Sequence, residues 1–261
     1  MELTKDVLFK IVMGSCLCFL LLFFVLVVAS VATYTSLDAL LSSLISDEIL
    51  FSIQLSVFTA TITTILSLVV AVPAAYTLSR TKFLGKGLVD MILNIPIVTP
   101  PVALGAALLI FFNTPIGAGT RDIFVFELPG IILAQFMVVS ALAVRVVKST
   151  FDDIDPIYEN VARTLGYNKF RAFFSVVLPL SKNGLLAAAV LAWARALGEF
   201  GATVTLAGAT RMKTETLSIA IYLSLATADV VKAAAVILIL VVLAVSTFLV
   251  IQWITRRGVL I

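Results

Sequence analysis

The sequence lacks histidine altogether, and only 13% of its 261 residues are charged. The absence of histidine excludes acid–base chemistry and metal ligation by imidazole groups. Soluble domains carry about 25% charged residues, so the low charge and the hydrophobic content of 61% indicate an integral membrane protein. The two cysteines, Cys16 and Cys18, lie in the first apolar run, where we expect membrane-buried thiols and neither a disulfide nor a metal site.

A phosphate-binding loop is also missing from the sequence. No stretch matches G-x-x-x-x-G-K-[ST], and Gly85-Lys86 lacks the upstream glycine of that motif. If the chain takes part in active transport, ATP and its magnesium must be handled by another polypeptide. We therefore expect no enzyme, no cofactor or metal site in this chain, and no nucleic-acid partner.

Six apolar stretches are long enough to cross a bilayer, which takes about 20 mostly apolar residues. We predict an all-α, polytopic membrane protein with six transmembrane helices in a single domain over residues 1–261. The first run exceeds the roughly 7–15 apolar residues of a signal-peptide core, so a retained helix is expected, with cleavage near Ala32 as the alternative. The stretches are residues 11–32, 50–78, 91–112, 129–147, 183–206 and 233–253.

The second stretch is rich in hydroxyl side chains between Ser52 and Ser67. Small polar residues let membrane helices approach closely and form hydrogen bonds across an interface. We therefore expect this helix inside the bundle, where the hydroxyls serve packing alone or line an aqueous path.

Helix-breaking residues interrupt the first half of the third stretch, where Asn94, Pro96, Thr99, Pro100 and Pro101 occur. At membrane depth such residues are tolerated only where neighbours or water satisfy the freed carbonyl groups. Broken helices of this kind often line the substrate sites of transporters. A plain proline kink is the alternative.

Two opposite charges lie deep in the fifth stretch. Arg195 and Glu199 are four residues apart and can share one helical face. At about 1.5 Å per residue from Asn183 they reach or pass the bilayer midplane, where ionisable groups are costly and should pair inside the bundle. The pair is either structural, or Arg195 helps an anion to pass while Glu199 holds or releases it. Ser181 is expected to cap this helix.

The longest polar interruption is the loop over residues 150–182. Asp155 followed by Pro156 predicts a helix start. Gly166 can close that helix in a left-handed conformation, Asn168 can cap a second helix, and Leu178-Pro179 should break the pattern. Both helices are amphipathic, and the loop holds four acids and four bases, a balance that suits a protein partner better than anionic lipid. A loop that merely joins two membrane helices is the alternative.

Lysine and arginine residues concentrate on one side of this topology. The two termini and the loops after the second and fourth stretches hold most of them, whereas the opposite loops hold few, among them Arg121, Arg211 and Lys213. This bias predicts that both termini and the loop over residues 150–182 lie in the cytoplasm. We therefore expect a multi-pass protein in the lipid bilayer of the cell (plasma) membrane.

Four segments of the sequence resemble a known family. Gly166, nine further residues and then Val176-Val177-Leu178-Pro179 resemble the EAA loop of ABC importer permeases (type I). Where that family has Glu-Ala-Ala, this chain has Asn160-Val161-Ala162, with Glu159 one position earlier. The runs over residues 159–166, 94–105 and 196–203 resemble molybdate-type permeases, and the first of these also resembles the sulfate branch.

The resemblance implies functional residues in two regions. In the family the loop is a coupling helix seated in a groove of a separate ATPase subunit, and the fifth helix contributes to an external gate. The implied ATPase-coupling residues are Glu159, Asn160, Val161, Ala162, Arg163, Thr164, Leu165, Gly166, Tyr167, Leu178 and Pro179. The implied pathway and gate residues are Thr99, Pro100, Pro101, Arg195, Gly198, Glu199, Phe200, Gly201 and Thr203.

The resemblance also implies partners and a substrate class. It predicts a homodimer with the pathway on its two-fold axis, two ATPase subunits that bind ATP and magnesium, and an extracytoplasmic substrate-binding protein. The expected cargo is an oxyanion, molybdate or tungstate, with sulfate or thiosulfate as the alternative. An ion-gradient-driven secondary transporter and a membrane scaffold without transport activity are the rival functions.

Overall fold

The computed structural model describes the backbone of residues 2–258 and the side chains of residues 6 and 8–249. Lys5, Arg256 and Arg257 are among the terminal basic residues that predict cytoplasmic termini, and their side chains lie outside the described residues. Over the described range the chain is helical and contains no strand. Its elements are α1 (Glu2–Ala32), α2 (Leu37–Ile45), α3 (Asp47–Arg80), α4 (Lys86–Val98), α5 (Pro101–Phe112), η1 (Ala118–Thr120), α6 (Arg121–Phe124), α7 (Leu128–Asp152), α8 (Ile157–Thr164), α9 (Lys169–Ala172), the π-helical turn η2 (Phe173–Val177), α10 (Leu178–Leu180), α11 (Lys182–Leu197), α12 (Gly201–Ala207), α13 (Leu217–Ala226) and α14 (Val230–Gly258).

Four helices are long and apolar enough to cross a membrane: α1, α3, α7 and α14. Two further spans exist only as bent pairs. The helices α4 and α5 meet at 109°, and the segment from α9 to α10 meets α11 at 72°. The prediction of an all-α, multi-pass protein is confirmed, and the predicted number of six spans is reached when each bent pair counts as one.

The third and fifth stretches depart from straight helices in different ways. The third breaks at Thr99, between α4 and α5, so the broken helix and not the plain kink is the observed geometry. The fifth, expected as one helix over residues 183–206, ends at Leu197 and resumes at Gly201 as α12. That part of the prediction is wrong, because residues 201–207 are again free of charged side chains and extend the apolar stretch, although α11 and α12 are separate helices.

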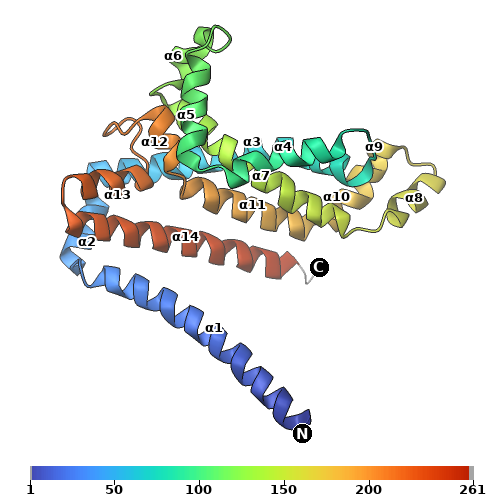
Figure 1. Cartoon of the computed structure of the whole chain (residues 1–261), viewed down its shortest axis with the longest axis horizontal. Helices are drawn as coiled ribbons and strands as arrows, with labels where there is room; N and C mark the ends of the chain where they lie inside the picture. The colour runs from blue at the N-terminus through green and yellow to red at the C-terminus, as the bar shows by residue number, and fades with distance from the viewer. Residues whose placement is uncertain (1, 259–261) are drawn as a thin grey trace.

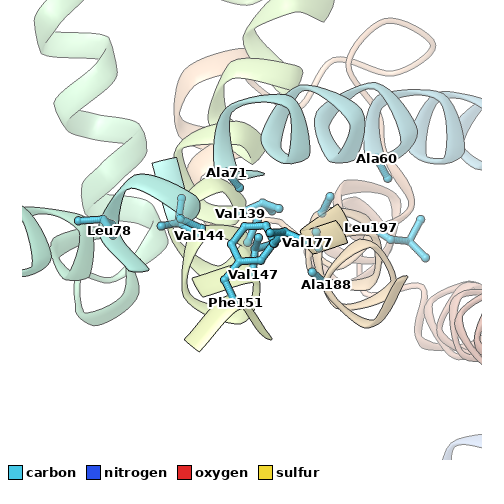
Figure 2. Close-up of a cluster of buried hydrophobic side chains, with 14 residues drawn as sticks. Ala60, Ala71, Leu78, Val139, Val144, Val147, Phe151, Val177, Ala188 and Leu197 are labelled. Atoms are coloured by element: carbon cyan, nitrogen blue, oxygen red, sulfur yellow. The ribbon is translucent and has the colours of Figure 1, made fainter. Parts of the chain in front are cut away.

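Helix α3 lies at the centre of the bundle, as its hydroxyl content predicts. It packs against α7, α11 and α13, and Ser52, Ser56, Thr59, Thr63 and Ser67 are buried. Figure 2 shows how small side chains fill the space between these helices. The cluster it draws contains alanines and valines from α3, α7 and α11 around Phe151 and Val177. Small residues permit the close approach on which helix association in lipid depends.

The N-terminal helix α1 stands apart from the bundle and diverges from α14 toward its own N-terminal end (Figure 1). Its apolar side chains from Leu8 onward are uncovered by the rest of the chain. Cys16 and Cys18 are free thiols on this helix. The beginning of α1 and the end of α14 both point toward the end of the bundle that carries α8 (Figure 1).

The loop over residues 150–182 forms the two predicted short helices. Gly166 adopts φ +92°, the left-handed conformation expected at the end of α8. The Asn168 side chain accepts a hydrogen bond from Arg171 N at 2.8 Å and so caps α9. Asp155 accepts from Ile157 N at 2.9 Å, although α8 begins one residue later than predicted.

The end of this loop differs from the prediction in two ways. Leu178-Pro179 does not break the helix: the chain passes through the π-helical turn η2 into α10 and bends only at Ser181. A π turn widens the helix just before the proline, whose nitrogen cannot donate a backbone hydrogen bond. Ser181 does not cap α11 with its side chain, because its hydroxyl donates backward to Leu178 O at 2.9 Å.

Candidate functional site: two adjoining helix breaks and a surface helix

The two helix breaks lie side by side. A Cβ atom placed on Gly201 at the start of α12 would lie 3.1 Å from Pro101 Cβ and 2.9 Å from a methyl group of Val102. A Cβ atom on Gly105 of α5 would lie 2.6 Å from the carbonyl oxygen of Ala202. The helices α5 and α12 therefore touch backbone to backbone, and the structure brings the predicted Pro101 and Gly201 together.

Arg195 and Glu199 form the predicted ion pair across the second break. Arg195 Nη1 lies 2.6 Å from Glu199 Oε2, and the Glu199 side chain is 1% exposed. The other carboxylate oxygen accepts a hydrogen bond from Ala202 N at 2.9 Å, at the first turn of α12. A carboxylate is favourable at a helix N-terminus, so Glu199 joins the end of α11 to the start of α12. The charge of Arg195 is neutralised within the chain.

The remaining predicted gate residues differ in their surroundings. Thr203 is fully buried, and the Phe200 ring lies 5.2 Å from that of Tyr222 on α13. A Cβ atom on Gly198 would have only an ordinary contact, 3.6 Å from Ala194 O. The close helix contact is therefore made at Gly201, whereas Gly198 lies where α11 ends.

Gln135 of α7 is almost completely buried and is not among the residues predicted for the site. Its Oε1 accepts from Thr63 Oγ1 at 2.9 Å, and its Nε2 donates to Thr59 Oγ1 at 3.3 Å and to Ala196 O at 3.1 Å. The carbonyl of Ala196 is in the last turn of α11, just before the break. Gln135 thus connects α3, α7 and the broken helix, and the signal for it was a single amide within an apolar run.

Helix α8 projects from the other end of the bundle, where Figure 1 shows it at the tip of the loop. Glu159 points inward and not toward the outer surface: its Oε1 lies 2.5 Å from Arg80 Nε and its Oε2 accepts from Tyr76 OH at 2.7 Å. Both charged side chains are only 12% exposed. Arg80 also donates to Ile154 O at 2.7 Å. The pair ties α8 and its preceding turn to the end of α3.

The opposite side of α8 is apolar and uncovered. Val161 is 53% and Leu165 77% exposed, with Ile157 and Tyr158 beside them, while Ala162 is buried. This surface, made by Ile157, Tyr158, Val161 and Leu165, is called the α8 face below. The other predicted coupling residues differ in exposure: Asn160, Arg163, Thr164 and Pro179 are exposed, and Tyr167 and Leu178 are half-buried.

A stacking contact supports the turn after α8. The guanidinium group of Arg171 lies 4.3 Å from the centroid of the Tyr167 ring, a cation–π distance. It fixes Tyr167 next to the left-handed Gly166.

Spanning helices with adjoining breaks are typical of membrane transport proteins. The fold is shared with a solved structure: a bacterial alginate ABC transporter, in complex with an alginate pentasaccharide-bound periplasmic protein, has a chain that matches with a TM-score of 0.80 at 15% identity, covering 98% of this chain and 96% of that one. Residues 67–258 match the family model described as binding-protein-dependent transport system inner membrane component. The chain belongs to this family.

Two curated relatives are similar over most of their length. The molybdenum transport system permease protein ModB of Haemophilus influenzae is 35% identical over 73% of this chain and 86% of its own length. The molybdate/tungstate transport system permease protein WtpB of Pyrococcus furiosus is 35% identical over 75% of this chain and 74% of its own length. Both are named as permeases, which agrees with the predicted membrane translocation component of an ABC importer.

Proposed function

We propose that this chain is the membrane subunit of an ATP-driven oxyanion importer whose cargo is molybdate or tungstate. The names of the ModB and WtpB relatives support this cargo. The observation that carries the ATP-driven mechanism is the α8 face, an exposed apolar surface on a rigidly held helix outside the membrane-spanning segments. The chain then works as a single transmembrane domain, and ATP and magnesium are bound by separate ATPase subunits.

Docking of an ATPase on α8 is mechanically useful because α8 is anchored. The Glu159–Arg80 pair and the Tyr76 hydrogen bond attach it to α3, and α3 packs against α7 and α11. A displacement of α8 is thereby transmitted to the helices that carry the two breaks. ATP-driven closure of the ATPases draws the α8 helices of two copies together and opens the gate formed by Thr99, Pro100, Pro101, Gly198, Phe200, Gly201 and Thr203.

The rest of the assembly follows the same proposal. Two copies of the chain enclose the pathway, both termini and α8 face the cytoplasm, and a substrate-binding protein delivers the anion at the opposite end. The direction in which the ends of α1 and α14 point supports a common side for the termini and α8. ATP and the loaded binding protein must both prefer the outward-open state, since a ligand shifts an equilibrium only by its differential affinity.

The alternative of a secondary transporter would need Arg195 and Glu199 for a coupling ion, and their contacts do not favour that use. Arg195 and Glu199 hold each other, and Glu199 also caps α12, so neither is set aside for a coupling ion. A scaffold without transport activity does not account for two adjoining helix breaks that meet backbone to backbone.

Reconstitution tests the proposal. The chain is placed in proteoliposomes with its ATPase and its binding protein, and uptake of tungstate, molybdate and sulfate is measured with and without ATP. We expect uptake that requires ATP and all three components, with tungstate and molybdate preferred over sulfate. Uptake by the chain alone under an ion gradient, or uptake of none of these anions, would contradict the proposal.

A further inference from the structure

One positively charged side chain on the spanning helices, that of Arg145, has a neutral partner where other basic residues have a carboxylate. Arg80, Lys148 and Arg195 each lie 2.5–2.7 Å from a carboxylate oxygen. Arg145 on α7 instead donates through Nε, at 2.7 Å, and through Nη2 to the side-chain oxygen of Asn94 on α4. Within the described part of the chain, no carboxylate forms an ion pair with Arg145. Its partner is neutral, so its positive charge remains uncompensated.

The depth of Arg145 follows from contacts along α7. Gln135 bonds to the carbonyl of Ala196 and therefore lies at the level of the second helix break. Arg145 comes ten residues later, which is about 15 Å toward the α8 end at 1.5 Å per residue. Asp152, the last residue of α7, is about 10 Å further. Arg145 thus lies between the gate and the inner end of the helix, where a charge is costly unless it faces protein or water.

The surroundings of Arg145 indicate water. Arg145, Ser149 and Asp152 are the exposed positions in the second half of α7, and their spacing of four and three residues puts them on one face. A lipid-facing stripe would be apolar, whereas this one is polar throughout. Asn94, which accepts the hydrogen bonds of Arg145, belongs to α4, the inner half of the broken third span.

We propose that Arg145, oriented by Asn94, binds the oxyanion on the inner half of the pathway after it has passed the gate. This inference rests on the proposed import function. A guanidinium group has five N–H donors; those used on Asn94 fix the plane of the group, and the others are available to a tetrahedral oxyanion. Planar, paired donors suit such oxygens. A neutral amide orients the arginine without cancelling the charge that attracts the anion.

The proposal separates the two arginines by role. Arg195 is neutralised by Glu199 and acts in the architecture of the gate, whereas Arg145 carries the net charge that the anion meets next. A lipid phosphate offers the same chemistry as a free oxyanion, so the experiment has to distinguish these two sources.

Substitutions at the Asn94–Arg145 contact test the assignment. Asn94→Asp is nearly isosteric and supplies the missing carboxylate, and Arg145→Gln removes the charge. In the reconstituted complex we expect each to reduce ATP-driven tungstate uptake at least tenfold while ATPase association is retained. Lys148→Gln, one turn away at a cation already paired with Asp152, is the matched control and should transport normally. Normal uptake by Asn94→Asp would overturn the inference, and absence of uptake by the wild-type complex would instead refute the proposed function.

A binding measurement shows whether Arg145 binds a free oxyanion or a lipid phosphate. Tungstate added to the purified wild-type chain should raise its melting temperature in vesicles of neutral phosphatidylcholine, and this shift should be lost in Asn94→Asp and kept in Lys148→Gln. A stabilisation that depends on anionic lipid and not on tungstate would assign Arg145 to a lipid headgroup and overturn the inference.

Discussion

At the scale of single residues, the charged side chains act mainly as ties between distant segments. Glu159, for which the family resemblance implies an ATPase-coupling role, binds Arg80 and Tyr76 within the chain. The sequence could not reveal this, because the partners lie 79 and 83 positions away and only the folded bundle brings them together. Gln135 was missed for the same reason. By contrast, the left-handed Gly166 and the cap at Asn168 were predictable, since each depends on local backbone chemistry alone.

A buried acid at the other end of the bundle makes a prediction about pH. Glu215 is fully buried, and its Oε2 accepts from Met212 N at 3.2 Å. Burial raises the pKa of Glu215, and the nearby carboxylate of Glu48 raises it further, while Lys232 opposes the effect. Because the pKa of Glu215 is higher in the folded than in the unfolded state, the protonated carboxyl group contributes to the stability of the fold. This contribution is complete at low pH and is lost as the pH rises through the raised pKa.

Glu215→Gln should therefore stabilise the protein more at about pH 8 than at about pH 5. The glutamine keeps the acceptor for Met212 and cannot ionise. Each kcal/mol gained should raise the melting temperature by about 2–4 °C, which thermal unfolding in detergent at the two pH values measures. Glu127→Gln, at a carboxylate that is 41% exposed and paired with Lys213, is the control and should show no such pH-dependent gain. An equal effect of Glu215→Gln at both pH values would argue against a raised pKa.

At the scale of helices, the apolar runs and their polar interruptions predicted most of the elements. The break at Thr99 was foreseen because three prolines lie within six residues. The position of the break after Leu197 was not, because glycines are tolerated inside membrane helices, where Gly198 and Gly201 allow either a tight helix contact or a bend. The break exists because the Glu199 carboxylate accepts a hydrogen bond from Ala202 N at the start of α12, and because Gly105 and Gly201 let α5 and α12 meet.

Gly105→Ala should weaken the contact between the two breaks. The new Cβ atom would lie 2.6 Å from Ala202 O, a backbone atom that cannot move away freely. Overpacking of this kind costs about 1–3 kcal/mol, so we expect a lower melting temperature and slower ATP-driven uptake. Gly87→Ala is the control: the glycine is within α4, its Cβ atom would meet nothing within 4 Å, and an alanine favours the helix by up to about 1 kcal/mol. Equal stability of the two variants would contradict the tight contact.

At the scale of the whole molecule, the two ends of the bundle have different tasks. One end holds the adjoining breaks of α5 and α12, and the other presents the α8 face, with α3 connecting them. The sequence predicts α8 as an amphipathic helix, because Tyr158, Val161, Ala162 and Leu165 are spaced to share one helical face. Only the structure separates Ala162, which is buried, from Val161 and Leu165, which are not. The central claim is that this face receives force from an ATPase.

The affinity of the purified chain for its ATPase tests that claim most directly. Val161→Lys and Leu165→Lys are combined, because lysine is favourable near a helix C-terminus and should leave α8 folded. Loss of two buried apolar contacts, at about 1.5–3 kcal/mol each, should weaken binding by about 100-fold or more. Ile116→Lys, at an 85% exposed apolar residue in the loop after α5, should bind normally. Unchanged affinity of the double variant would contradict the account.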